Sequence, residues 1–446
     1  MKKEKTIPSG VYKLEGRVPL QTAIPLGMQH VLAMFAGNLA PLLAVFGVAN
    51  LSVSTEIEIL QNTMFIAGLI TLVQLFPLFG KIGSGLPTVM GTSSGFIPVS
   101  ISIASTFGYG AVLGSSLIGG IVEFCLGFFI KPLRKILPHI VTGTVVTTLG
   151  ISLIPVGMKF VGGGVGQEST EAFGSFRNLL LAGIVLIVII ALKTFATGMI
   201  SASSILIGIL VGFVVSIAMG AVDFTAVANA PWFAIPKPFF LLEEVTLEFN
   251  IEAIIPFVLV FLATTVETIG DNTGIAVGGL GRDITDQELT GAVFADGFGS
   301  AVASVFGVMP NTSFSQNVGI IGMTKIVNRF VIMTGAIFLI ACGFFPKLGA
   351  LIRCIPNSVL GGAVLMMFAM ISISGLQLIN EDGLDERAGL ILAVSMGFGF
   401  GLSNVPQVMQ HMPTWVQNMF GQAIVGAFVT ATILNLLIPK KEKVNA

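Results

Sequence analysis

Apolar stretches of about 20 residues follow one another along most of this 446-residue chain, beginning at Leu20. A helical stretch of this length spans a hydrocarbon layer about 30 Å thick. The chain is 54% hydrophobic and only 10% charged, whereas soluble proteins have roughly 25% charged residues. The sequence therefore predicts an all-α membrane protein that crosses a lipid bilayer many times, with little chain left for a soluble domain.

Fourteen such spans are expected, and the charges between them set their orientation. With the N-terminus in the cytoplasm, all but five of the 22 Lys and Arg residues fall on the cytoplasmic side, as the positive-inside rule expects. We therefore expect a multi-pass protein of the cytoplasmic membrane with both termini in the cytoplasm. The five residues expected outside are Lys159, Arg177, Lys237, Lys347 and Arg353. The spans are predicted at 20–46, 57–80, 86–106, 109–130, 138–160, 178–197, 200–221, 250–272, 288–307, 311–323, 327–346, 356–379, 387–403 and 414–438.

The composition argues against several other classes of protein. The formal net charge of −1 offers no basic surface for nucleic acid. The three cysteines, Cys125, Cys342 and Cys354, are isolated and lack metal-ligand spacing. Neither a disulfide framework nor a metal site is expected from them, and no cofactor is expected. The first residues lack the pattern of a cleaved signal peptide.

The chain also repeats itself at offsets of 216 to 219 residues. Three short patterns recur in the same order, which favours two halves of seven spans each over accidental similarity among apolar residues. Because seven is odd, consecutive halves enter the membrane from opposite sides and form an inverted repeat, as in many secondary transporters. The matched segments are 89–94 with 308–313, 127–131 with 343–347, and 138–143 with 356–361.

Corresponding segments of the two halves interrupt their spans. Residues 83–98 and 307–317 are rich in Gly, Ser, Thr and Pro, which disfavour a continuous helix. Each segment is expected to form an extended stretch and then a half-helix, whose N-terminal N–H groups face a site near the membrane centre. Kinked spans packed on their neighbours are the alternative. The residues expected to cap the half-helices are Thr92, Ser93, Asn311 and Thr312.

Four acidic residues are predicted well inside spans, where a charged side chain costs about 2.5–3.5 kcal/mol. Glu267 and Asp271 are four residues apart and share one face of the eighth span. A carboxylate there can accept N–H groups of a ligand or carry a proton, or it can be structural. Asp296 on the ninth span has the same alternatives, and the isolated Glu123 is interpreted as structural. His30 on the first span either relays protons or orients a neighbouring helix.

The residues Gln316–Lys325 form a recognisable motif, Gln-Asn-Val-Gly-Ile-Ile-Gly-Met-Thr-Lys. This run resembles the motif of the nucleobase-ascorbate transporter family, also called nucleobase cation symporter-2, at all five positions that the motif specifies. The resemblance covers nearly the whole chain. It extends to Gln29 and His30, to Glu267 and Asp271, to Asp296, and to Gly91, Thr92 and Ser93.

The resemblance implies a core domain and a gate domain. It also implies proton-coupled uptake by an elevator-like alternating-access mechanism, commonly in a homodimer. The core domain would comprise residues 20–135 (spans one to four) and 250–350 (spans eight to eleven), and the gate domain residues 136–222 (spans five to seven) and 351–438 (spans twelve to fourteen). Residues 1–19 and 439–446 would lie in the cytoplasm and the loop 223–249 outside.

The resemblance also implies roles for individual residues. Glu267 and Gln316 would hydrogen-bond a nucleobase, and the backbone around Phe96 and Ser315 would close over its ring. Gln rather than Glu at position 316 is typical of carriers of xanthine and uric acid, since uracil carriers usually have Glu there. The segment Ser93-Ser94-Gly95-Phe96 departs from the Ser-Phe-Asn-Phe of many bacterial xanthine carriers, so xanthine, urate and a broader nucleobase range stay open. The residues that would shape the site or the proton path are Asn317, Asp271, Asp296 and His30.

Two other classes fit parts of the sequence. An anion carrier of the related sulfate-transporter class would place a cation near the half-helices and carry a C-terminal cytoplasmic domain. Here the candidate site is acidic, and only Lys440–Ala446 follow Pro439. An intramembrane aspartyl protease needs two cooperating aspartates, but Asp271 lacks the Gly-x-Gly-Asp context. A transporter and not an enzyme is therefore expected.

Overall fold

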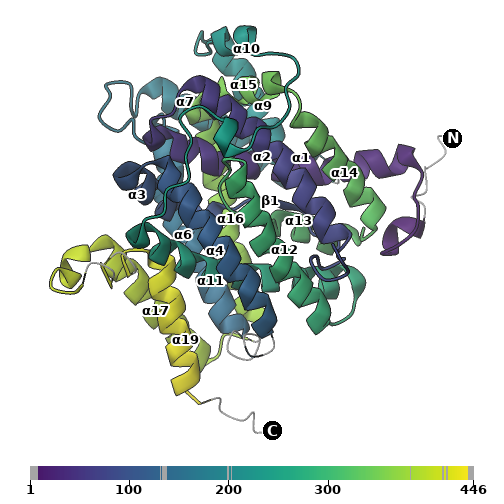
Figure 1. Ribbon diagram of the computed structural model, residues 1–446, viewed down its shortest axis with the longest axis vertical. Helices are drawn as coiled ribbons and strands as arrows, with labels where there is room; N and C mark the ends of the chain where they lie inside the picture. The colour runs from purple at the N-terminus through teal and green to yellow at the C-terminus, as the bar shows by residue number, and fades with distance from the viewer. Residues whose placement is uncertain are drawn as a thin grey trace.

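The computed structural model describes residues 9–130, 132, 138–197, 200–201, 203–381, 383–413, 416–417 and 420–439. Over these residues the chain is mostly helical, as predicted (Figure 1). The helices of the first half are α1 (Leu20–Ala49), α2 (Val53–Leu75), α3 (Ile97–Phe107), α4 (Tyr109–Leu126), α6 (His139–Gly162), α7 (Phe176–Phe195) and α9 (Ser204–Ala218). Those of the second half are α11 (Ile251–Gly274), α12 (Asp286–Val305), α13 (Ser315–Thr324), α14 (Arg329–Cys342), α16 (Asn357–Glu381), α17 (Glu386–Asn404) and α19 (Ala423–Leu437). Two short helices, α10 (Thr225–Asn229) and α15 (Pro346–Arg353), lie in connections.

Every predicted span overlaps one of these helices, but their lengths differ. Among the described residues, seven helices are long and apolar enough to cross a membrane, or eight if α14 and α15, which meet at 85°, count as one span. The total of fourteen crossings stays a prediction. The basic residues Lys131, Arg134 and Lys135, and those in 1–8 and 440–446, lie outside the described residues.

Several helices expose large apolar side chains that a soluble protein would cover. Ile187 of α7 is 67% exposed, Val214 of α9 64% and Leu436 of α19 65%. Lipid tails cover such surfaces without cost, whereas water does not. The apolar helices and their exposed faces therefore belong to an integral membrane protein.

The helices pack in two groups, and the packing of one half is matched in the other. In the first group α1, α2, α3 and α4 pack with α11, α12, α13 and α14; in the second α6, α7 and α9 pack with α16, α17 and α19. The contact of α4 with α12 has its counterpart in α2 with α14, and α11 with α4 in α1 with α14. Figure 1 shows α17 and α19 at one edge of the molecule and α14 at the opposite edge. These contacts are thus related in pairs, while the inverted repeat and the division into core and gate domains stay predictions.

A two-stranded antiparallel sheet lies inside the first group of helices. Strand β1 (Met90–Thr92) pairs with β2 (Asn311–Ser313), with Gly91 opposite Thr312 at the centre. These strands are the extended stretches predicted in the third and tenth spans. Each is followed by a half-helix, which begins with the 3-10 turn η2 (Ser94–Phe96) and α3 in the first half and with α13 in the second.

The outer edges of this sheet are capped by side chains, which explains how extended backbone is tolerated in the middle of the bundle. Thr92 N donates to Asn38 Oδ1 of α1 at 2.7 Å, and Met90 N donates to Thr71 Oγ1 of α2 at 2.9 Å. On the other strand, Asn311 N donates to Ser300 Oγ of α12 at 3.1 Å. Backbone groups that would otherwise be buried and unpaired are thereby satisfied.

The predicted helix caps are only partly correct. Ser93 caps η2 by accepting from Gly95 N at 3.3 Å. Thr92, Asn311 and Thr312 instead belong to the strands. The second half-helix begins at Ser315 with no side-chain cap, because the pairing of β2 with β1 holds residues 311–313 extended.

Candidate functional site

A small polar cavity lies where the strand pair meets α11 and the beginnings of the two half-helices. Its volume is about 20 Å³, enough for about one water molecule. Sites for small organic molecules usually measure roughly 300 Å³ or more. An organic ligand therefore requires this region to open. The cavity is lined by Thr92, Ser93, Ser94, Gly95, Leu149, Glu267, Thr312, Ser313, Phe314, Ser315, Gln316 and Ile371.

Helix α11 supplies the acidic side of the cavity. Glu267 lines it, and Ser315 Oγ donates a hydrogen bond to Glu267 Oε1 at 3.3 Å. One turn further, Asp271 Oδ2 accepts from Ser313 Oγ at 2.6 Å. The predicted polar face of this span thus meets the end of β2 and the start of α13, and the structure brings Glu267 and Asp271 together there.

Helix α13 contributes Ser315 and Gln316 to the cavity wall, while Asn317 points elsewhere. Asn317 Nδ2 donates to the His30 carbonyl oxygen at 3.0 Å and lies 3.1 Å from His30 Nδ1. Both side chains are buried. The two residues fasten α13 to α1, which places them behind the cavity and not on its surface.

Phe96 lies next to the cavity, but its side chain is buried in an aromatic cluster. Its ring centroid is 4.5 Å from that of Phe261 and 5.1 Å from that of Phe257, both on α11. The neighbouring Ser94 and Gly95 line the cavity instead. Any contact of this segment with a ligand would therefore come from its backbone and from Ser94, and Phe96 holds the segment against α11.

Two cavity residues were not anticipated from the sequence. Of the described residues that line the cavity, two come from the second group of helices, Leu149 of α6 and Ile371 of α16. They give the cavity one apolar wall opposite the polar residues of the first group. Nothing in the sequence distinguishes them, because they are apolar residues within apolar spans.

The remaining predicted acids lie deeper in the first group of helices. Asp296 of α12 is fully buried and hydrogen-bonded to Thr268 of α11, and Thr268 Oγ1 is 3.5 Å from Ser313 Oγ. Glu123, interpreted as an isolated residue, is 2.9 Å from Thr265 Oγ1 through its Oε1 atom. Within the described ranges, no group of three or more His, Cys, Asp or Glu side chains could hold a metal ion.

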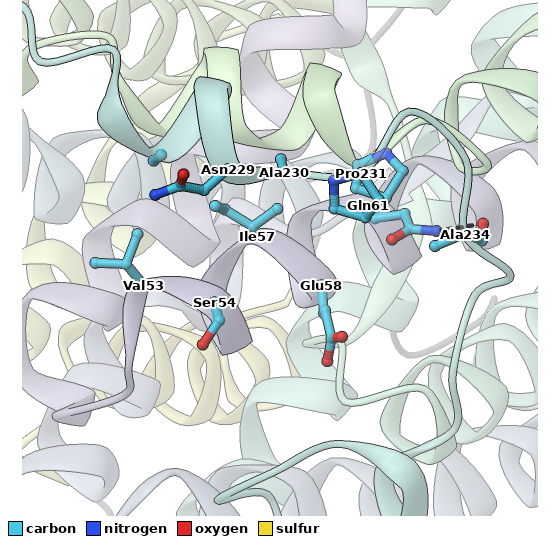
Figure 2. A pocket seen from close by; sticks show the side chains of 11 residues that line it. Val53, Ser54, Ile57, Glu58, Gln61, Asn229, Ala230, Pro231 and Ala234 are labelled. Atoms are coloured by element: carbon cyan, nitrogen blue, oxygen red, sulfur yellow. Dashed lines mark hydrogen bonds between the residues drawn. The ribbon is translucent and has the colours of Figure 1, made fainter.

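A larger cavity, of about 310 Å³, lies away from the predicted site residues (Figure 2). It separates the beginning of α2 from the segment around Pro231 and is mostly apolar. Two of its polar residues are engaged: Gln61 Nε2 donates to the Ala234 carbonyl at 2.8 Å, and Glu58 forms an ion pair of 2.5 Å with Lys237. These bonds hold the connection around Pro231 against α2, so we attribute this cavity to the packing of that connection.

The chain is similar to permeases over nearly its whole length. A family model described as "Permease family" matches residues 21–408. The chain is 33% identical over 442 residues to the xanthine permease XanQ of Escherichia coli K12, covering 96% of this chain and 94% of that protein. It is 34% identical over 423 residues to the uric acid permease PucJ of Bacillus subtilis, covering 94% of this chain and 93% of that protein.

Solved structures show the same fold. The transmembrane domain of a cyanobacterial bicarbonate transporter, BicA, superimposes with a TM-score of 0.60 over 93% of this chain and 100% of that chain, at 14% sequence identity. At this identity the likeness concerns the fold alone.

Proposed function

We propose that this chain, which belongs to the nucleobase-ascorbate transporter family of permeases, takes up xanthine or uric acid together with protons across the cytoplasmic membrane. Family membership confirms the resemblance of the motif Gln316–Lys325. The relatives named above are permeases of purines, and they supply the substrate class from which the proposal starts.

One observation carries the proposal: Glu267 and Gln316 line the same cavity from two different elements. A carboxylate accepts hydrogen bonds only, whereas the Gln amide both donates and accepts. Xanthine and urate present N–H donors and carbonyl acceptors along their edges, so this pair can match them. A base with the wrong pattern would leave buried polar groups unpaired, which strongly disfavours its binding.

The placement of the cavity supports an alternating-access mechanism of the elevator type. The polar residues, both strands and both half-helix starts belong to the first group of helices, and only Leu149 and Ile371 come from the second. Movement of the first group past the second would carry a bound base from one side of the membrane to the other. The narrowness of the present cavity fits a closed arrangement, in which both groups of helices contact the site.

Proton coupling is proposed from the acids around the site. Glu267, Asp271 and Asp296 lie on adjacent elements and each accepts a hydrogen bond from a Ser or Thr hydroxyl. No Lys or Arg forms an ion pair with them within the described residues. Binding and release of a proton by such acids would neutralise them during passage across the membrane.

The proposal is tested by uptake of labelled xanthine into proteoliposomes with an imposed pH gradient. We expect an inward proton gradient to drive accumulation, and unlabelled urate or xanthine to compete. Competition by uracil alone would favour the uracil alternative. Uptake of bicarbonate or sulfate with no nucleobase uptake would favour an anion carrier of the shared fold and refute the proposal. The homodimer is checked separately, by the mass of the purified protein in detergent.

A further inference from the structure

Two buried carboxyl groups, Glu123 of α4 and Asp296 of α12, have an arrangement that contact with a base does not explain. Both side chains are 0% exposed. One oxygen of each contacts a Thr hydroxyl of α11, Thr265 for Glu123 and Thr268 for Asp296. The other oxygen of each, Glu123 Oε2 and Asp296 Oδ1, has no hydrogen-bond partner within the described part of the chain.

The two carboxyl groups converge on one face of α11. Thr265 and Thr268 are three residues apart, so they are neighbours on the same helix face. Helices α4 and α12 approach closely beside the two acids: a Cβ atom on Gly297 would lie 2.3 Å from Phe124 N and 2.5 Å from the Gly120 carbonyl oxygen. Figure 1 shows α4, α11 and α12 side by side. Glu123 and Asp296 therefore lie next to the residues through which α4 and α12 pack closely.

Among the described residues, the ionisable groups that act on the pair are acids. Glu267 and Asp271 are the ionisable residues on the part of α11 that faces it. The adjacent α3 carries no ionisable side chain, and α2 offers α12 the neutral amide of Gln74, which donates to the Ala292 carbonyl. Neither Glu123 nor Asp296 has a Lys or Arg ion-pair partner in the described ranges. Two adjacent carboxylates without a cation cannot both stay ionised inside a membrane.

The contacts of Thr265 leave room for a proton on Glu123. Thr265 Oγ1 lies 2.8 Å from the Phe261 carbonyl oxygen and 2.9 Å from Glu123 Oε1. A hydroxyl has one hydrogen to donate, and a carbonyl oxygen can only accept. When Thr265 donates to Phe261, as Ser and Thr in helices commonly do, the contact with Glu123 requires a hydrogen on the glutamic acid.

The pair is connected to the candidate site by hydroxyl groups. Asp296 contacts Thr268, whose Oγ1 is 3.5 Å from Ser313 Oγ, and Ser313 donates to Asp271 at 2.6 Å. Ser313 also lines the cavity. The side chains of Thr268 and Ser313 therefore connect Asp296 to the cavity wall.

We propose that Glu123 and Asp296 together hold one proton and form a second proton-binding site behind the cavity, separate from Glu267. Loss of this proton leaves both carboxyl groups ionised. This inference rests on the proposed proton-coupled uptake and adds Glu123 as a positioning residue that sets how firmly Asp296 keeps the proton.

The test is the pH profile of xanthine uptake by Glu123→Gln in proteoliposomes. Gln keeps the size of Glu but removes its negative charge, so Asp296 ionises more readily and proton binding weakens roughly tenfold. The pH at which uptake falls to half its maximum then moves about one unit toward acid. Glu123→Asp keeps the charge and is expected to retain the wild-type midpoint. A purely structural role would change the amount of folded protein and leave the midpoint where it is, and this outcome would overturn the inference.

A second measurement applies if Glu123→Gln does not reach the membrane. Infrared spectra of Thr265→Val and of the wild-type protein are compared, because a protonated carboxyl absorbs at higher frequency when its hydrogen bond is removed. A shifted band supports a proton on Glu123, and identical spectra overturn it. If wild-type uptake itself shows no dependence on protons while xanthine still competes for the site, the proton-coupled function and this inference fail together.

Discussion

The two strand–helix segments that cross at the centre of the molecule have the same backbone plan but different side chains. Strand β1 leads into α3, which begins with apolar residues such as Ile97 and is anchored by Phe96 in an aromatic cluster. Strand β2 leads into α13, which begins with Ser315, Gln316 and Asn317.

This difference assigns separate tasks to the two halves of the repeat. The first segment mainly supplies framework, because Phe96 packs against Phe257 and Phe261 of α11. The second supplies chemistry, because Ser315 and Gln316 line the cavity and Asn317 fixes α13 to α1. Both segments therefore reach the cavity, the first through small residues such as Ser93 and Ser94 and the second also through the amide of Gln316.

The largest effect is expected at Glu267, which faces the second segment. Glu267→Gln removes the negative charge and replaces one acceptor oxygen with an NH2 donor, and we expect the rate of xanthine uptake to fall at least about 100-fold. The matched control is Glu252→Gln, the same change at an exposed position in the first turn of α11. Uptake is measured at equal amounts of protein in the membrane. Full uptake by Glu267→Gln would remove it from the binding site.

The next largest effects compare one residue from each half-helix. Gln316 and Ile97 occupy equivalent positions at an offset of 219 residues. Gln316→Ala is expected to raise the KM for xanthine by about 10- to 100-fold, since one buried hydrogen-bond partner is lost. Ile97→Ala should instead lower the free energy of unfolding by about 2–5 kcal/mol and leave KM within about twofold. Kinetics of uptake together with thermal unfolding in detergent distinguish the two results, and equal KM changes would contradict the division of tasks.

A smaller effect is expected from the close packing of β1. A Cβ atom on Gly91 would lie 2.6 Å from both Met34 Cε and Phe314 Cε2, so Gly91→Ala is expected to destabilise the fold by about 1–3 kcal/mol. Gly319 of α13 has no atom within 4 Å of the same position, and Gly319→Ala serves as the control. Unfolding temperatures measure both. Equal stability of the two variants would show that the sheet yields to the added methyl group.

The smallest effect is expected for the bond between α13 and α1. A double-mutant cycle of Asn317→Ala and His30→Ala should give a coupling energy of about 1 kcal/mol in xanthine binding, because the two residues act through one contact. Binding is measured by calorimetry on the purified protein. Additive effects would mean that Asn317 and His30 act independently, and Asn317 would then be tested for direct contact with the base.

The sequence predicted the elements that carry strong local signals. The fourteen apolar stretches correspond to helices, and the Gly-, Ser- and Pro-rich segments became the two strands because such residues disfavour helix. The sequence also singled out Glu267, Asp271 and the motif around Gln316, because polar residues within a membrane are costly and therefore rare. In the structure these residues lie near one cavity.

What the sequence could not predict depends on contacts between distant segments. Leu149 and Ile371 are indistinguishable from other apolar residues until α6 and α16 pack against the cavity. Glu123 looked isolated because its neighbours in sequence are apolar, and its partner Thr265 lies on another helix, 142 residues away. The predicted caps Asn311 and Thr312 were wrong because strand pairing, a long-range interaction, overrode a local preference.

The apolar wall formed by Leu149 and Ile371 has a consequence for the rate of the proposed transport cycle. In the proposed elevator movement, a hydrogen bond between a bound base and the second group of helices would have to break whenever the first group moved past the second. Hydrocarbon side chains make contacts that are weak one by one and independent of direction. The wall would therefore exclude water from one side of the base without forming directional bonds that must break during transport.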